Sequence, residues 1–401
     1  MATETGSSPS WPAVGYEERP WQRSGDEVAS RRALLQARGP YRAAVPPQIA
    51  ELVVALDSEL TAAADDASAE LARFDAEAGF IAAPFASILL RTESASSSEV
   101  ENLTSSAKQV ALAEIGASSS GKANLVVANV RAMNAALALA DRLEEESILA
   151  MHDALLRESA PHFVGGWRDQ QVWIGGGAIS PHAASFVPPH HERVPELMGD
   201  LVAFTERTDI PVLIQAALAH AQFETIHPFP DGNGRTGRAL LQGILRHGGL
   251  TRNVTVPVSA GLLADLDGYF AALSAYRDGD LRPIVDTVVH ASFSAVHNGR
   301  ALVDDIQTAA ARWDELVTAR SHSSVHRVKE YLLRQPVVNA KTVAEAVGVS
   351  DVAAQNAIDR LVDAGVLVKV SSGRRNRIWA APDILEALDA FGARARRGRL
   401  G

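Results

Sequence analysis

The sequence predicts an all-α protein that carries one small β-hairpin flap and a C-terminal winged helix-turn-helix domain. Three observations support this fold class. Apolar residues recur at helical spacing over most of the first 320 residues, as at Leu52, Leu56 and Leu60. β-branched alternation is scarce before residue 160, whereas alanine, the best helix former, is common. Beyond residue 320, three short helical segments precede two candidate strands around a basic turn.

Length and composition exclude several classes of protein. The 401 residues suffice for two or three domains, and 47% hydrophobic with 21% charged residues is typical of folded chains. No cysteine is present, which excludes disulfides, thiolate zinc sites and a cysteine nucleophile. No apolar run approaches the ~18 residues of a membrane span. The first 20 residues lack the pattern of a secretory signal, so we expect a cytoplasmic protein.

The N-terminal part divides into an irregular segment and a helical core. Residues 1–40 are rich in Ser, Gly and Pro, which predicts little regular structure. The core extends over residues 41–300, and Gly- and Pro-rich stretches interrupt it at 164–190. These stretches flank a short extended piece, Gln171–Ile174, which is either a flap on the helical body or an ordinary surface loop.

Helical periodicity resumes after the interruption. Predicted helices cover 194–207, 211–226, 235–247, 260–276 and 280–300, and a connecting helix with a linker covers 301–322. The C-terminal domain then extends over 323–401.

The most specific feature of the sequence is the run HPFPDGNGRTGR, from His227 to Arg238. Gly232 and Gly234 permit positive φ just before a helix that begins near Arg235. The N-terminus of such a helix binds anions, because its first N–H groups have no intrahelical acceptor and the dipole favours negative charge. Arg235 and Arg238 are three residues apart and share one helix face, which suits a polyphosphate.

Two further side chains in the run supply reactive chemistry. Asp231 offers a hard oxygen ligand for Mg²⁺, which binds one or two carboxylates together with phosphates. His227 is the nearby group suited to accept a hydroxyl proton at neutral pH. Together they indicate phosphoryl or nucleotidyl transfer with Mg²⁺ as cofactor. The alternative is a glycine-rich turn with surface arginines, which the number of specified positions disfavours.

At these residues the sequence resembles the Fic domain family, whose signature is His-x-Phe-x-(Asp/Glu)-Gly-Asn-Gly-Arg-x-x-Arg. Every position of the signature is matched. The upstream stretch AHAQFETIHPF, the downstream GRALLQGIL and FVPPHHERVPELM also look family-like, so the resemblance covers about residues 41–300. It implies an α-helical core that moves AMP from ATP onto a Tyr, Thr or Ser hydroxyl of a target protein, which could be the chain itself.

The resemblance also implies roles for individual residues. His227 would take the hydroxyl proton, Asp231 would hold Mg²⁺, and Phe229 would pack beneath the loop. Residues 171–176 would form a flap that binds the target backbone by strand addition. Tyr269 and Phe270 would line the adenine side, or else are simple core aromatics. The residues expected to contact the nucleotide are Gly232, Asn233, Gly234, Arg235, Thr236, Gly237, Arg238, Ile174, Gly175, Tyr269 and Phe270.

A weaker pattern, Ser97-Ser98-Glu99-Val100-Glu101-Asn102, fits the motif Ser/Thr-x-x-x-Glu-Gly/Asn. In part of the Fic family this motif lies on an inhibitory helix, and its glutamate pairs with the second signature arginine, here Arg238. The resemblance therefore predicts an inhibitory helix near 97–110, capped by Ser97, with Glu101 in its first turns. Ser97, Glu101 and Asn102 are the candidate inhibitory residues. The alternative is a solvated acidic helix start.

The C-terminal segment differs in charge from the rest of the chain. The net charge of the chain is −10; residues 321–401 have thirteen basic and eight acidic side chains, a charge of +5, which leaves −15 for the rest. A winged helix often binds DNA through its third helix, here 351–364. That helix offers only Gln355, Asn356 and Arg360 for base contacts, so a protein-interaction or dimerisation module, and hence a homodimer, is the other interpretation. Arg394–Arg399 would form a basic tail.

Other functions remain open at the level of sequence. The same loop and glutamate could remove AMP from a modified protein, or transfer another phosphate-containing group. A different class is a DNA-binding regulator whose Fic core only senses nucleotide. His182, His190 and His191 could hold zinc, although histidines of a surface loop are the simpler interpretation.

Overall fold

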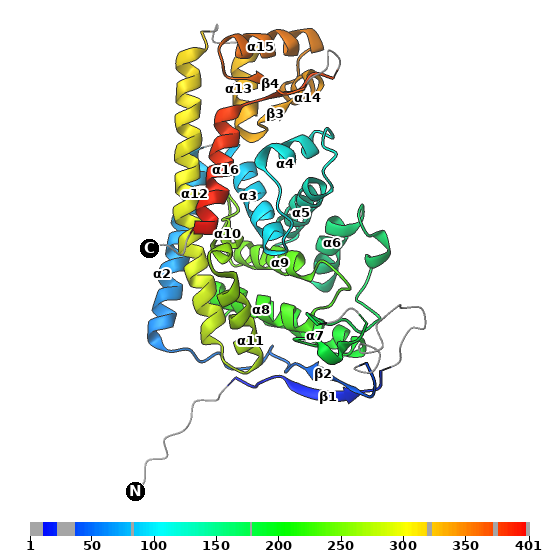
Figure 1. The fold of residues 1–401 in the computed structure, drawn as a ribbon. Helices are drawn as coiled ribbons and strands as arrows, with labels where there is room; N and C mark the ends of the chain where they lie inside the picture. The colour runs from blue at the N-terminus through cyan, green and yellow to red at the C-terminus, as the bar shows by residue number, and fades with distance from the viewer. Residues whose placement is uncertain are drawn as a thin grey trace. The chain divides into compact units, whose positions relative to one another are not determined.

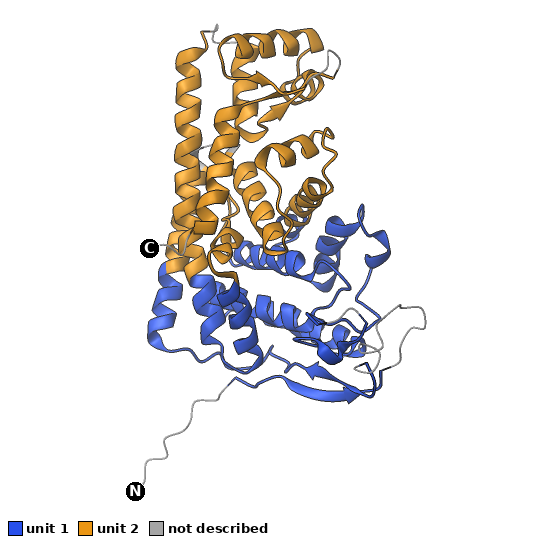
Figure 2. Ribbon diagram, in the orientation of Figure 1, with its two compact units in different colours: residues 1–66, 135–248, 267–289 blue, residues 67–134, 249–266, 290–401 orange. Residues whose placement is uncertain are grey.

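The computed structural model describes residues 11–21, 37–81, 84–176, 179–318, 323–371 and 376–397. The described chain is mostly helical, as the sequence predicts (Figure 1). Two compact units are present, coloured separately in Figure 2. Unit 1 comprises residues 1–66, 135–248 and 267–289, and unit 2 comprises 67–134, 249–266 and 290–401. In the described ranges, no helix is both long and apolar enough to span a membrane.

Unit 1 is built around a buried helix. Its strands and helices are β1 (Gly15–Arg19), β2 (Tyr41–Val45), α6 (Glu145–Leu156), α7 (Val194–Thr205), α8 (Val212–Ile226) and α9 (Asn233–His247), with short 3₁₀ helices at Pro161–Phe163, Pro181–Ala183 and His191–Arg193. Helix α8 is buried from Leu213 to Ile226 and packs against α7 and α9. Gly237 of α9 allows this close approach, because a Cβ there would lie 2.9 Å from the Phe223 ring.

The N-terminal segment is not wholly irregular, which corrects the prediction for residues 1–40. β1 pairs antiparallel with β2, in a register that joins Gly15 to Val45 and Arg19 to Tyr41. Tyr41 and Ala43 are buried against Val187. The pairing partner lies more than twenty residues along the chain, and the composition of residues 1–40 alone does not indicate it.

The predicted flap contains a single antiparallel bridge. Ile174 N–H donates to the Phe186 carbonyl at 2.8 Å, and Phe186 N–H donates back at 3.2 Å. Gly175 and Gly176 have φ of 71° and 76°, which turns the chain at the end of the extended piece. Trp173 lies in a cluster with buried Tyr41 and partly buried Trp21, so the base of the flap packs on aromatic side chains.

Unit 2 contains the segment with the predicted inhibitory motif and the C-terminal domain. It holds α3 (Pro84–Val100), α4 (Ala107–Glu114), α10 (Val258–Leu262), a 3₁₀ turn at Leu263–Asp265, α13 (Ser324–Arg334), β3 (Val337–Val338), α14 (Ala340–Val347), α15 (Asp351–Asp363), β4 (Val368–Lys369), β5 (Trp379–Ala380) and α16 (Pro382–Arg397). Four helices contribute residues to both units: α2 (Ser58–Ile81), α5 (Gly121–Ala138), α11 (Leu266–Arg277) and α12 (Arg282–Leu316).

Two helix boundaries differ from the prediction. α12 is continuous over 282–316, so no break separates the core at residue 300 from a connecting helix at 301. Gly299 does not end the helix, because it lies against the Phe74 ring, where a Cβ would come within 2.8 Å. The predicted helix at 260–276 is instead α10, a 3₁₀ turn and α11.

The C-terminal domain has its three helices where the sequence predicts them, and its strands form a three-stranded sheet in the order β3-β5-β4. Strand β3 was not predicted. The predicted basic tail is also wrong over Arg394–Arg397, which form the last turn of α16. Residues 372–375 of the predicted wing and Arg399 lie outside the described residues. Assignment to the winged-helix class stays a prediction.

Candidate active site

The site begins where α8 ends. His227 is the C-cap of α8 and has φ 52° and ψ 61°, the left-handed conformation that stops a helix. Its N–H still donates to the Phe223 carbonyl at 2.8 Å. A residue other than glycine is uncommon in this conformation and needs support from its surroundings.

Arg168 provides that support, and the sequence analysis missed it. Its Nε donates to the His227 carbonyl at 2.8 Å, and its backbone N–H donates to the Pro228 carbonyl at 2.9 Å. The remaining guanidinium hydrogens reach the carbonyls of Gln170 and Pro189, at 2.9 and 2.6 Å. Burial lowers the pKa of this guanidinium to about 10. A buried fork thus fixes the backbone that carries His227.

The underside of the loop rests on aromatic packing, as predicted for Phe229. Phe229 is fully buried and stacks on His152, with ring centroids 3.6 Å apart and planes within 1°. His152 Nε2 lies 3.0 Å from the Asp231 carbonyl, and burial lowers its pKa, which favours the neutral imidazole. Asn233 Oδ1 accepts from the Phe229 N–H at 2.9 Å while its Nδ2 donates to the Phe229 carbonyl at 2.8 Å. The side chain of Asn233 therefore braces the loop.

The N-terminus of α9 follows directly. Gly232 is its N-cap at φ 81°, and a Cβ there would come within 3.0 Å of Leu155. Gly232 N–H donates to Asp231 Oδ1 at 2.6 Å, while the Asp231 side chain stays 58% exposed. Arg235 and Arg238 are both buried, and Arg235 Nη2 lies 3.9 Å from Asp231 Oδ1. The first turn thus combines helix N–H groups, two guanidinium groups and an exposed carboxylate.

The imidazole of His227 is partly exposed beside these groups. Its Nδ1 lies 3.9 Å from Oε2 of Glu224, one turn back on α8. A carboxylate at this distance stabilises an imidazolium through charge. The sequence analysis did not single out Glu224, although its place three residues before His227 was a usable signal.

Several residues predicted to contact the nucleotide serve the packing of unit 1. Thr236 is fully buried, and Gly237 lies against Glu224 and Phe223 of α8. Tyr269 is buried, and its hydroxyl lies 2.8 Å from His220 Nε2, whereas Phe270 is 51% exposed. Their contact with a nucleotide stays a prediction, and so does that of Ile174 and Gly175 in the flap.

The segment of the predicted inhibitory motif has a different local structure from the one expected. Residues 97–110 are not one helix: α3 ends at Val100, and Ser97 lies buried in its last turn, not at an N-cap. Leu103 N–H donates to the Ser98 carbonyl at 3.0 Å, and Asn102 N–H donates to the Glu99 carbonyl at 2.8 Å. With Asn102 at φ 60°, this is a Schellman motif, and Glu101 is the C-cap of α3.

The Schellman motif explains the last position of the sequence pattern. Only glycine and asparagine readily adopt the left-handed conformation that the residue after Glu101 requires. Glu101 lies in unit 2 and Arg238 in unit 1, and their pairing stays a prediction.

The histidines of the loop after the flap contact other groups of unit 1. His182 Nε2 lies 3.1 Å from the Gly39 carbonyl, and His190 Nδ1 lies 3.2 Å from Glu192. Across the described ranges, no three His, Cys, Asp or Glu side chains gather in a way that would hold a metal ion. The metal-binding role of Asp231 stays a prediction.

Replacement of Arg168 tests the support of the loop. We expect Arg168→Lys to lower the free energy of unfolding by about 2 kcal/mol, because lysine keeps the charge but leaves buried carbonyls unpaired. Thermal unfolding would measure this loss. Exposed Arg142→Lys is the matched control, and equal melting temperatures of the two variants would contradict the role of Arg168.

Comparisons with known proteins agree on one family. The Fic/DOC family model matches residues 142–245. Protein adenylyltransferase fic-1 of Caenorhabditis elegans is 33% identical over 159 residues, which are 39% of this chain and 28% of that protein. A probable protein adenylyltransferase of Aquifex aeolicus is 48% identical over 87 residues, 21% of this chain and 25% of that protein. The chain thus spans less than a third of each of these relatives.

A solved structure extends the likeness of the fold. A Fic family protein from Desulfovibrio desulfuricans superposes with a TM-score of 0.52 and 21% identity, and covers 82% of this chain and 97% of that one. This similarity concerns the fold alone. The match to the family model includes the whole run from His227 to Arg238.

Proposed function

Because residues 142–245 form a Fic/DOC family domain, we propose that the chain is a protein adenylyltransferase. It would move AMP from ATP to a Tyr, Thr or Ser hydroxyl of a target protein. The relatives named protein adenylyltransferase support this class of reaction.

One observation carries the proposal: a short loop joins His227, which has the left-handed conformation, to the N-terminus of α9. His227 ends one buried helix, and Gly232 and Asn233 begin the next. A proton acceptor and an anion site are therefore held by the same short loop. Since Arg168, His152 and Asn233 all bind the backbone of this loop, the geometry is set before substrate arrives.

The chemistry follows from these positions. His227 accepts the proton of the target hydroxyl, whose oxygen attacks the α-phosphorus of ATP. The new O–P bond forms as the bond to the β-phosphate oxygen breaks, and pyrophosphate leaves. Negative charge that grows on the phosphates is stabilised by the N–H groups of α9 and by Arg235 and Arg238. Glu224 stabilises the imidazolium that results.

The residues present fit a magnesium ion bound with the nucleotide. Asp231 presents an exposed carboxylate at the helix N-terminus where the phosphates would lie. Mg²⁺ binds such sites through one or two carboxylates plus phosphate oxygens, and it would neutralise phosphate charge there. Asp231 would hold the ion, and Gly232 N–H orients the carboxylate through its bond to Oδ1.

The flap would position the target. The extended piece that ends at Ile174 is bridged on one side to Phe186. Strand addition to its other edge would align a target backbone beside the loop.

The same proposal includes inhibition by Glu101. Its carboxylate would pair with Arg238 and take the place of the γ-phosphate, so that ATP binds with its α-phosphate turned away from attack. Removal of AMP from a modified protein is the competing activity of this site. Incubation with α-labelled ATP and Mg²⁺, then mass spectrometry, tests addition; incubation of the modified target without ATP tests removal.

A second function concerns the C-terminal domain, for which the side chains of α15 favour a protein partner over DNA. Gln355 Nε2 donates to Asp359 at 2.7 Å, and Arg377 donates to Gln355 Oε1 at 2.8 Å. Arg360 donates to the Thr318 carbonyl. Two of the three candidate base-reading groups are thus already bound within the chain, while apolar Val352 is 71% exposed.

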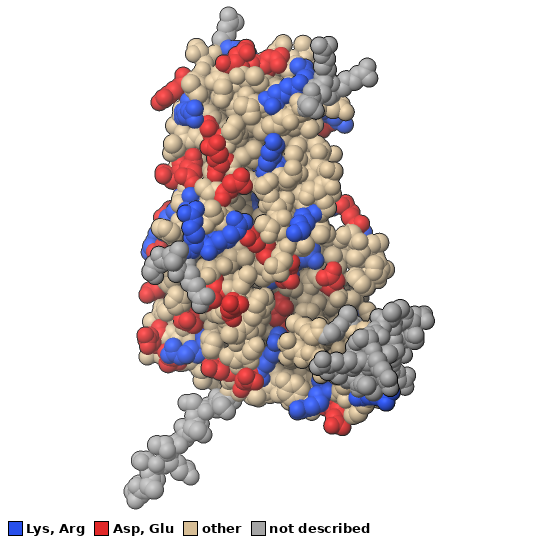
Figure 3. All heavy atoms as spheres, in the orientation of Figure 1, with Lys and Arg blue, Asp and Glu red and all other residues tan. Residues whose placement is uncertain are grey.

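Surface charge supports the same interpretation. On the face seen in Figure 3, acidic and basic side chains are interspersed over the C-terminal domain, at the top of the view. DNA-binding surfaces instead concentrate basic side chains.

A salt series tests this interpretation. We expect the full chain to show no binding to duplex DNA at 50 mM salt, because Arg360, the single basic side chain of α15, is already bound. Fluorescence anisotropy with a labelled duplex would measure it. Binding that weakens steeply between 50 and 200 mM salt would instead establish phosphate contacts and favour the DNA-binding regulator.

A further inference from the structure

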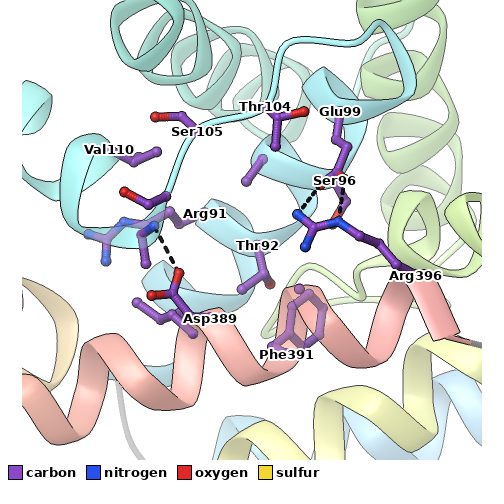
Figure 4. Close-up of a pocket in the computed structure, with 15 residues that line it drawn as sticks. Arg91, Thr92, Ser96, Glu99, Thr104, Ser105, Val110, Asp389, Phe391 and Arg396 are labelled. Carbon is purple, nitrogen blue, oxygen red and sulfur yellow. Dashed lines mark hydrogen bonds and ion pairs between the residues drawn. The ribbon is translucent and has the colours of Figure 1, made fainter. Parts of the chain in front are cut away.

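The turn that carries Glu101 is held at both ends by one helix of the C-terminal domain. Before the turn, Glu99 makes a two-pronged ion pair with Arg396 of α16, at 2.5 Å to Nε and 3.0 Å to Nη2 (Figure 4). After the turn, Asp389 Oδ1 accepts from the Ala107 N–H, the first N–H of α4, at 3.2 Å. Helix α16 therefore contacts the chain on both sides of residues 101–106, through Arg396 before them and Asp389 after them.

Helix α16 is itself anchored, so it can serve as a fixed support. Arg394 donates to Asn298 at 2.7 Å and to Asp305 at 3.1 Å, both on α12. Asn298 Nδ2 donates in turn to the Phe391 carbonyl at 3.1 Å. At the start of α16, Asp383 accepts from the indole N–H of Trp313 at 2.8 Å.

Between the two polar contacts the packing is open. A cavity of about 470 Å³ lies among α3, residues 104–107 and α16, and Figure 4 shows it flanked by the two contacts. Its lining is mostly apolar, with a minority of hydroxyl groups that includes those of Thr92, Ser96 and Thr104. Since a cavity lacks the contacts of a packed core, the hold on the turn depends on the two polar contacts.

We propose that Arg396 and Asp389 are positioning residues for the inhibitory carboxylate of Glu101, so that the C-terminal domain sets the strength of inhibition. The proposal rests on the proposed function, in which Glu101 restrains transfer. Arg396 acts through Glu99: it fixes the Glu99 carboxylate, and the Schellman motif links that position to Glu101 two residues later. Loss of the contact loosens the turn and lowers the fraction of molecules in which Glu101 is in place.

The first experiment measures the turn without reference to activity. Amide hydrogen exchange of the full chain is compared for wild type, Arg396→Ala, Asp389→Ala and Arg397→Ala. Arg397 is the matched control, because it lies on the same helix and donates only within it, to the Ala393 carbonyl. We expect faster exchange over residues 101–107 in the first two variants only. Unchanged exchange in both would overturn the proposal.

The second experiment measures incorporation of labelled AMP. Arg396→Ala should raise the incorporation of AMP about two- to fivefold, because the loss of a half-exposed ion pair shifts a conformational equilibrium by about this factor. The exchanged pair Glu99→Arg with Arg396→Glu should restore low incorporation, which a general loss of structure would not do. In a Glu101→Gly background, Arg396→Ala should add nothing, and an additive rise would overturn the proposal.

The two experiments separate the failures. If Glu101→Gly itself raises nothing, the inhibitory part of the proposed function is wrong, and hydrogen exchange still decides whether α16 holds the turn. If Glu101→Gly raises incorporation while Arg396→Ala and Asp389→Ala do not, the proposed function stands and the positioning role is wrong.

Discussion

His227→Asn is expected to lower AMP transfer by about 10²–10⁴-fold, because His227 would accept the hydroxyl proton and the Asp231 carboxylate of the same loop would hold Mg²⁺. Asparagine is the better replacement than alanine, since it tolerates the left-handed conformation that His227 adopts at the end of α8. The backbone is then preserved while the base is lost. The measurement is the initial rate of label transfer from α-labelled ATP, with ATP affinity measured in parallel.

The control for this variant is His162→Ala, which removes an exposed histidine outside the loop. It should transfer AMP at the rate of wild type. Both variants should keep the melting temperature within a degree or two, because neither change creates a buried cavity or an unpaired buried charge. Transfer by His227→Asn at an undiminished rate would show that another group takes the proton.

Glu101→Gly is expected to raise transfer by about tenfold or more, because orientation of the reacting groups is worth several kcal/mol of barrier. In the proposed inhibition, removal of the carboxylate would free Arg238 for the γ-phosphate, so the rate should rise far more than the ATP affinity. Labelling of the chain itself and of a target protein, side by side with wild type, measures the effect.

The matched control is Asn102→Gly. Glycine suits the left-handed residue of the Schellman motif even better than asparagine, so the turn and Glu101 stay in place and transfer stays low. The double variant Glu101→Gly with His227→Asn should be inactive. Equal, low labelling of wild type and Glu101→Gly would return Glu101 to the role of a solvated acidic side chain.

The loop from His227 to Arg238 could be predicted from sequence because its structure is local. Gly232 at positive φ, a proline-rich turn and a helix start all lie within twelve consecutive residues, whereas Gly234 lies inside α9 and does not have the positive φ that the sequence predicts for it. Short-range sterics and hydrogen bonds decide such a conformation, and the residues that decide it are adjacent. The resemblance to a family then supplied roles that geometry alone leaves general.

The segment of the predicted inhibitory motif differs from its prediction. The sequence pattern predicts that Ser97 caps the start of a helix, whereas α3 ends at Val100 and Asn102 has the left-handed conformation that follows a helix end. The asparagine was the usable signal, since it is a common left-handed residue after a helix C-terminus. The arginines near the C-terminus favour the prediction of a basic tail, whereas Ile384, Leu388 and Phe391 recur at the spacing of a helix. All three side chains are buried in α16.

By itself, the sequence determined the helical class and the composition of the reactive loop. Only the tertiary structure decided what holds that loop and what holds the turn of Glu101. Arg168 binds the His227 carbonyl from 59 residues away, and Arg396 binds Glu99 from 297 residues away. Nothing in the neighbourhood of either arginine marks its partner, because a contact between distant residues forms only when the packing of helices brings the two together, and that packing depends on the whole chain at once.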